Sequence, residues 1–182
     1  MPLPVAIAAT LQLLLAVTFL VIPVTVWFTG TAAQRAAEAE VARQGHSPDV
    51  LARHGIRFAE RAWEFMLALT IAAILIVLAA LNLTGSPSGR LLSWIAEPLI
   101  LLGVGLITTG QVFATRYTQA AFKRSGDAAT RAIDARLVIA AASSGFPAWL
   151  RPLVLARFAL TVLGSLLVII LLAVPAAGAY FG

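Results

Sequence analysis

Four long stretches with almost no charged residues limit what this chain can fold into. They run from Met1 to Gln34, Phe65 to Gly89, Leu91 to Thr115 and Phe158 to Gly182, and Glu97 is the only charge within them. Each stretch is longer than the roughly 20 apolar residues that a helix needs to cross a hydrocarbon core. The composition, 60% hydrophobic and 12% charged residues, is also far from that of soluble proteins. We therefore expect an all-α fold, an integral membrane bundle of four transmembrane helices with two helical cytoplasmic loops.

The polar and turn-forming residues between the apolar stretches mark the expected ends of the spans. We expect a single transmembrane domain over residues 1–182, with spans at approximately residues 3–29, 63–83, 91–115 and 153–178. A short external turn at 84–90 joins the second and third spans, and cytoplasmic loops at 30–62 and 116–152 join the others. The first stretch has about twice the length of a signal-peptide core and no basic start, so we interpret it as a membrane anchor.

Both loops contain helical patterns. Residues 32–43 are rich in Ala, Glu and Arg, which favour a helix, and Gly45 follows as a stop signal. Residues 127–142 have the periodicity of an amphipathic helix, with an apolar stripe formed by Ala129, Ile133, Leu137 and Ala140. Because Phe146, Trp149 and Leu150 come next, we expect this second helix to lie in the headgroup plane of the membrane.

The distribution of basic residues predicts the orientation. Residues 30–61 contain five Arg, residues 116–157 contain six Arg and one Lys, and the connection between the second and third spans contains Arg90 alone. With an even number of spans both rich loops lie on one side, which the positive-inside rule assigns to the cytoplasm. The sequence thus predicts a multi-pass protein with its N- and C-termini outside, and the excess of Arg over Lys indicates a bacterial cytoplasmic (inner) membrane.

The third span is apolar enough to cross a bilayer but has a row of polar residues on one side. On a helix with about 100° per residue, Arg90, Ser93, Glu97, Thr108, Gln111 and Thr115 fall in one narrow sector. Ionisable groups within spans are costly and usually line a pathway, pair or bind a ligand. We therefore name Glu97, Thr108, Gln111 and Thr115 as a polar track and ligand site for a proton, an ion or a small polar molecule. The alternative is that these side chains only satisfy neighbours in the bundle.

Two further features of the spans predict contacts between helices. Ala96, Gly103, Gly110 and Ala114 share another face of the third span, and small residues allow a neighbouring helix to approach closely. Glu64 and Arg157 lie about one turn inside the cytoplasmic ends of the second and fourth spans. Because both spans start from the same face, we expect these two residues to form a structural ion pair that fixes the register.

Several classes of chemistry are disfavoured by the residue inventory. The chain has no cysteine, and its two histidines, His46 and His54, both lie outside the spans, away from where a transmembrane haem would need its ligands. No nucleophile motif, metal-ligand cluster or phosphate-binding loop is recognisable. We predict no catalytic residues, no metal and no cofactor, and we favour a protein that is not an enzyme.

Three functional hypotheses remain. The first is a non-catalytic accessory or scaffold subunit of a larger membrane complex, which the packing surfaces and the lack of reactive groups favour. The second is a small oligomeric transporter or channel that uses the polar track on the third span. The third and weakest is a lipid- or quinone-active membrane enzyme. The expected partners are membrane lipids together with other membrane subunits or further copies of this chain, and no nucleic acid, because the basic residues flank spans rather than forming a recognition module.

Overall fold

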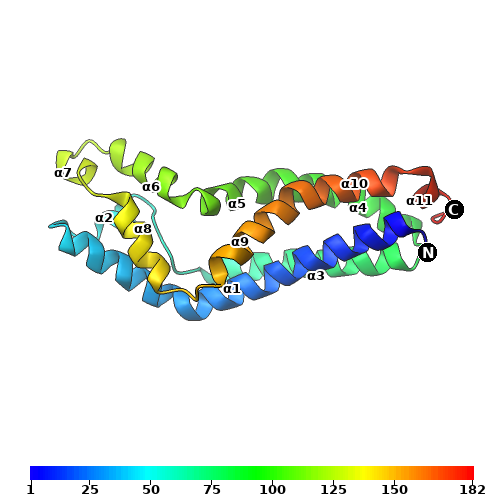
Figure 1. Ribbon diagram of the computed structural model, residues 1–182, viewed down its shortest axis with the longest axis horizontal. Coiled ribbons are helices and arrows are strands. Elements are labelled where there is room, and N and C mark those ends of the chain that lie inside the picture. Colours follow the sequence, from blue (N-terminus) through cyan, green and yellow to red (C-terminus); the bar gives the residue numbers. More distant parts are fainter.

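The computed structural model describes all residues, 1–182, as helices joined by turns, and it contains no strand. Four helical segments are long and apolar enough to cross a membrane: Leu3–Arg43, Ala62–Leu83, Pro87–Val112 and Leu150–Ala173. The predicted all-α bundle with four transmembrane helices is confirmed. Both chain termini lie at one end of the elongated molecule and the two long connections lie at the other end, as Figure 1 shows.

The spans are built from the following elements. The first span belongs to α1 (Leu3–Arg43) and the second is α3 (Ala62–Leu83). The third consists of α4 (Pro87–Leu99), the π-helix η1 (Ile100–Val104) and α5 (Gly105–Val112). The fourth consists of α9 (Leu150–Ala159), the π-helix η2 (Leu160–Gly164) and α10 (Ser165–Ala173), followed by the short α11 (Pro175–Gly178).

Helix α1 is continuous over 41 residues, whereas the sequence predicted a span ending near residue 29 and a separate helix at 32–43. Nothing between the two predicted segments breaks a helix, because Gly30 keeps helical geometry and the first left-handed residue is Gly45, at φ 81°. A helix of this length is about 60 Å long, twice the thickness of a hydrocarbon core. The second half of α1 therefore extends beyond the membrane, where the loops pack against it.

Three apolar clusters follow one another along the molecule. The cluster at the end with the termini joins α1, α10 and the C-terminal segment, and includes Val5 and Leu172. The middle cluster joins α1, α3 and η1 around Phe19 and Leu75. The third lies outside the spans around Phe122, with Ala37, Val41, Val50, Leu51, Ile133, Ala135, Val138 and Ala142. Large apolar side chains such as Leu102 and Leu106 remain exposed on the spans, as is typical of helices that face lipid.

The loops pack into a small domain against the projecting half of α1. This domain contains α2 (Val50–Arg53), α6 (Ala114–Lys123), α7 (Ala128–Arg131) and α8 (Ala135–Ser144). The predicted single helix at 127–142 is wrong, because the chain breaks at Asp134, whose carboxylate caps α8 by accepting a bond from the Arg136 N–H. Helix α8 packs on α1 and buries Val138, while Leu137 of the predicted stripe is exposed. The expected position of this helix in the headgroup plane stays a prediction.

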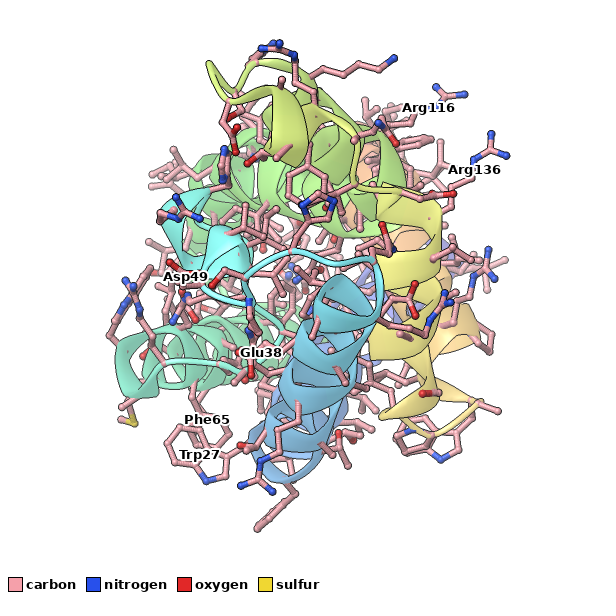
Figure 2. All side chains as sticks on the ribbon, turned by 90° about the vertical axis from the view of Figure 1, so that its left-hand side faces the viewer. Trp27, Glu38, Asp49, Phe65, Arg116 and Arg136 are labelled. Carbon is pink, nitrogen blue, oxygen red and sulfur yellow. The ribbon has the colours of Figure 1, made fainter.

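Figure 2 shows the loop end of the molecule face on. The rings of Trp27 and Phe65 lie against each other with their centroids 5.1 Å apart, one from α1 and one from α3. Arg116 and Arg136 point outward on the opposite side of this end. The aromatic pair lies where the spans meet the loop domain, a position typical of the membrane interface.

Candidate functional site

Glu97 lies in a cluster of buried polar side chains between the first three spans. Gln12 comes from α1, Asn82 from the last turn of α3, and Ser93 and Glu97 from successive turns of α4. All four residues are at most 1% exposed. Because hydrocarbon offers no hydrogen-bond partner, such residues must satisfy one another inside the bundle.

The cluster is held by four hydrogen bonds. Gln12 Nε2 donates to Glu97 Oε1 over 3.0 Å and to Ser93 Oγ over 3.1 Å. Asn82 Nδ2 donates to Gln12 Oε1 over 3.0 Å and to Ser93 Oγ over 2.9 Å. Gln12 is thus the bridging residue, and it makes contact with all three of the others.

The fourth span adds two hydroxyl groups, those of Thr161 and Ser165, both at most 1% exposed. Ser165 faces the Glu97 carboxyl group. The third and fourth spans each contain a π-helix at this level, which is a locally widened turn. In the third span η1 begins two residues after Pro98, which has no N–H to donate. In the fourth span η2 contains Thr161. The two π-helices lie against each other, and such widened turns occur frequently at functional sites.

Six buried side-chain atoms in the protein lack a well-formed hydrogen bond to another protein group, although the Glu97 carboxyl group and the Ser165 hydroxyl face each other. These atoms are Glu60 Oε2, Asn82 Oδ1, Glu97 Oε2, Arg157 Nε, Thr161 Oγ1 and Ser165 Oγ. Buried polar atoms are nearly always satisfied, so an accumulation of exceptions requires an explanation. Ordered water or a bound ion is the usual partner in such places.

Arg157 forms a second polar centre at the end of the bundle that adjoins the loop domain. It is only 4% exposed, although it carries a charge. Its guanidinium donates to Gln111 Oε1 at the end of α5 and lies 5.4 Å from the centre of the Phe19 ring. These contacts join the fourth span to the third and the first, so Arg157 holds three helices at one level.

Glu60 lies beside this centre, just before α3 begins. Partial burial, together with the neighbouring carboxylate of Glu64, raises the pKa of Glu60 to about 7, although the positive charge of Arg157 acts in the opposite direction. Glu64 itself does not meet Arg157 as we expected. It accepts a 2.9 Å bond from Arg57 and a 2.8 Å bond from the backbone N–H of Arg61, because its place in the first turn of α3 favours capping.

The two polar centres and the hydroxyl groups between them form one row along the bundle. Arg157, Thr161 and Ser165 follow at intervals of four residues on the fourth span, and Ser165 reaches the Glu97 cluster. Glu60 and Asn82 mark the two ends, because they lie just before the start and near the end of α3. A helix of 22 residues is about 33 Å long, the thickness of a hydrocarbon core. We call this set of residues the polar row.

The predicted track on the third span is only partly the row that the structure contains. Glu97 and Gln111 belong to it, as described above. Thr108 is buried, but its hydroxyl donates back to the carbonyls of Val104 and Gly105 in its own helix. Thr115 is half-buried in α6, past the bend at Phe113, and makes no side-chain hydrogen bond.

The predicted small-residue face is not packed against another span of this chain. A Cβ atom added at Gly103 or at Gly110 would meet nothing within 4 Å, and Ala96 and Ala114 are half-buried. The closest backbone approach lies elsewhere, at Gly145, where an added Cβ would stand 2.5 Å from the Cα of Ala33. The C-terminal end of α8 therefore packs against α1 through its C-cap residue, Gly145.

Sequence reasoning missed Gln12, Asn82, Thr161, Ser165 and Glu60 as members of the site. Gln12 and Asn82 are each the single amide within their predicted spans, 3–29 and 63–83, a signal that could have marked them. The hydroxyl residues give no such signal, because most threonines and serines in spans bond to their own helix, as Thr25 and Thr29 do here.

The donor set consists of one carboxyl group, two carboxamides, hydroxyls and a guanidinium, which is suited to holding protons, water or a small cation and offers no nucleophile beside a base. No group of three or more His, Cys, Asp or Glu side chains is arranged to hold a metal ion. Comparison with family models, with curated proteins and with solved structures finds no match for this chain.

Proposed function

We propose that this chain is a small membrane transporter that moves protons along the polar row. The observation that supports this proposal is the position of the six buried atoms that lack a well-formed hydrogen bond to protein, all of which belong to the row. A proton pathway needs groups that can accept a new hydrogen bond, because each transfer uses a free lone pair or a free donor. Random imperfections in packing would be scattered over the molecule.

Charge supports Glu97 as the proton-binding member. The ion pairs of the protein join Arg43 to Glu40, Arg53 to Asp49 and Arg57 to Glu64, so Glu97 has no basic partner. An isolated carboxylate in the interior of a membrane protein is costly, and a proton or a cation removes that cost. A protonated Glu97 could donate from Oε2 to the Ser165 hydroxyl that faces it.

The tight contacts favour a proton over a larger solute. Gln12, Asn82, Ser93 and Glu97 touch one another directly, at 2.9 to 3.1 Å between donor and acceptor. No solute fits between groups at these distances, whereas a proton passes by exchange of hydrogen bonds.

Proton flux into liposomes tests the proposal. The protein is reconstituted with a pH-sensitive dye inside the vesicles, and a potassium gradient with valinomycin supplies the voltage. We expect Glu97→Gln to reduce the flux to that of protein-free vesicles while the fold is retained, because the amide keeps the bond from Gln12 but takes up no proton. Glu38→Gln, which changes an acid on the projecting part of α1, should keep the full flux. Wild-type vesicles that leak no faster than empty ones would contradict the proposal.

A second pair of variants separates conduction from structure. Thr161→Val removes a buried hydroxyl that has no partner, so it should slow the flux without lowering the free energy of unfolding. Thr108→Val removes a hydroxyl that is already bonded to its own helix, and it should leave the flux unchanged. Equal fluxes for the two variants would place the pathway elsewhere.

An accessory subunit is the second candidate, and one observation favours it. Gly103 and Gly110 present a small-residue face on the third span with no neighbour from this chain, which suits close packing of another helix. Purification in a mild detergent followed by mass spectrometry distinguishes the cases. A foreign subunit in stoichiometric amount favours the accessory role, while the chain alone or a homo-oligomer favours the transporter.

A further inference from the structure

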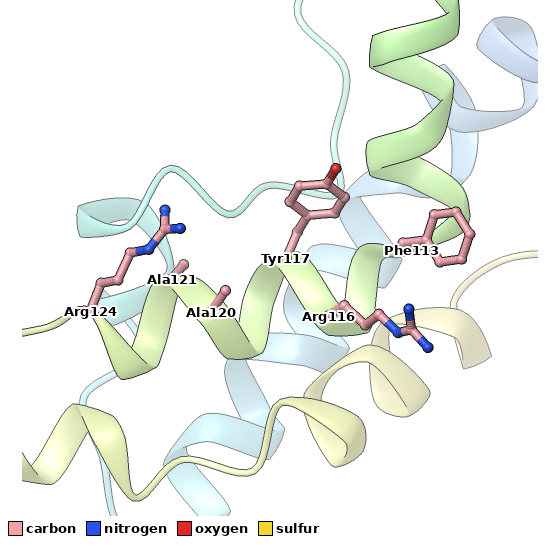
Figure 3. Close-up of a pocket in the computed structure, with 6 residues that line it drawn as sticks. All are labelled: Phe113, Arg116, Tyr117, Ala120, Ala121 and Arg124. Atoms are coloured by element: carbon pink, nitrogen blue, oxygen red, sulfur yellow. The ribbon is translucent and has the colours of Figure 1, made fainter.

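The chain bends sharply where the third span ends. Phe113 leaves helical geometry, with φ −102° and ψ 28°, and α6 begins at the next residue. In Figure 3, α6 runs away from the end of α5, and Tyr117, Ala120, Ala121 and Arg124 point to the side from which α5 arrives. The inner corner of the bend is an open groove of about 520 Å³ lined by these four residues with Phe113 and Arg116.

The groove has a positive charge that the protein does not neutralise. Neither Arg116 nor Arg124 takes part in any of the three ion pairs of the protein. The guanidinium of Arg116 lies over the Phe113 ring, 5.6 Å from its centre, and no carboxylate lines the groove. Two arginines around a floor of two alanines, with a tyrosine beside them, form a surface for an anion.

A second, apolar groove lies on the membrane side of the bend. It is about 300 Å³ in volume and runs between the third and fourth spans, with Leu102, Gly105, Leu106 and Thr109 on one wall and Phe158 and Val162 on the other. Thr109 and Phe113 are four residues apart, so the two grooves follow each other along the third span. An apolar groove that is followed by a basic groove matches a ligand with an apolar tail and an anionic head.

We propose that the two grooves together bind one anionic phospholipid, with an acyl chain between the third and fourth spans and the phosphate at Arg116 and Arg124. The position explains the chemistry of both parts, because the bend marks the end of a membrane span, where lipid headgroups lie. A lipid fits better than an acidic protein helix, because the basic groove adjoins the end of a membrane span and the apolar groove lies between two spans. This inference does not depend on proton transport.

Native mass spectrometry tests the headgroup. The purified protein is mixed with equal amounts of phosphatidylglycerol and phosphatidylcholine that have the same acyl chains. We expect the anionic lipid to be retained preferentially, and Arg116→Gln or Arg124→Gln each to reduce its binding about fivefold. Lys123→Gln removes the same charge from the same helix but outside the groove, so it should leave binding unchanged. Equal retention of the two lipids, or an equal loss with Lys123→Gln, would overturn the proposal.

A pair of glycine variants tests the acyl chain. Gly105 lines the apolar groove, and a Cβ atom added there would meet nothing within 4 Å, so the side chain of Gly105→Leu should enter the groove and weaken lipid binding. Gly103→Leu adds the same side chain at an exposed position outside the groove, where an added Cβ also meets nothing within 4 Å, and binding should persist. Displacement of the lipid by millimolar inorganic phosphate would show a site for free anions instead. Disulfide-linked dimers of an Ala121→Cys variant would show that a second copy occupies the corner, and either result would refute the lipid site.

Discussion

Gln12 in the first span and Glu97 in the third are joined by a 3.0 Å hydrogen bond across 85 positions of the sequence. Gln12 also holds Ser93 and accepts a bond from Asn82, so one side chain links three helices. The first prediction is that Gln12→Leu lowers the free energy of unfolding by about 1–3 kcal/mol, because buried polar groups lose their partner. Unfolding in mixed micelles measures this change.

Thr10→Val is the matched control for the Gln12 variant. It removes a polar group from the same helix, but the Thr10 hydroxyl is exposed and bonds only to the Ala6 carbonyl of its own helix. Its effect should remain within about 0.5 kcal/mol. If the two variants were equally stable, the cluster would add nothing to the cohesion of the bundle.

The second prediction concerns Glu60 and pH. Its pKa of about 7 in the folded protein is above its ordinary value of 4.5, so the folded state binds more protons between these limits. The free energy of unfolding should therefore decrease as pH rises from about 4.5 to 7, by about 1 kcal/mol because solvent screens this partly exposed group.

Glu60→Gln should remove this dependence. The variant and the wild type should behave alike at the acidic end of the window, and the variant should be the more stable one above pH 7. Unfolding measured in steps across the window checks the result. A variant that is less stable than the wild type at alkaline pH would mean that ionised Glu60 is stabilising.

The third prediction concerns the charge of Arg157, which opposes the rise in the pKa of Glu60. Arg157→Met removes this attraction, so the protonation of Glu60 should move to higher pH. We expect the decrease in stability of Arg157→Met to continue above pH 7, and the double variant with Glu60→Gln should not show it. If stability decreased over the same pH range in Arg157→Met as in the wild type, the two side chains would not interact.

The fourth prediction concerns the contact between the C-terminal end of α8 and α1. At Gly145 an added Cβ would stand 2.5 Å from backbone atoms of Ala33, which cannot move without shifting α1. Gly145→Ala should therefore cost about 1–3 kcal/mol by overpacking. Gly126→Ala is the control, because nothing lies within 4 Å of that position. Thermal unfolding of the two variants should differ clearly, and equal midpoints would mean that the helices separate freely.

The fifth prediction is the orientation, for which the distribution of basic residues is the argument. Reporter enzymes active only in the cytoplasm should be active when inserted at Gly45 or Gly126, and silent when fused after Gly182. The structure places the first two positions in the loop domain and Gly182 at the opposite end. Activity at Gly182 alone would invert the assignment.

The sequence by itself determined the number of spans, because a helix that crosses hydrocarbon must be long and apolar whatever its neighbours are. It also identified Glu97, since a charge in such a run is conspicuous. It did not give the end of α1, because a span and a solvated helix have the same backbone and no breaker separates them here.

Tertiary structure decided which polar side chains meet. Gln12, Asn82 and Ser165 approach Glu97 from three other spans, and no local pattern encodes a contact across 70 or 85 positions. Glu64 accepts a hydrogen bond from Arg57, and Arg157 donates to Gln111 instead of pairing with Glu64. Local capping at the start of α3 competes with an ion pair between helices. Hydrophobic runs determine that helices cross the membrane, whereas the rotation and packing of the helices determine which of their faces touch. The polar row depends on those contacts between helices and is therefore decided by the tertiary structure.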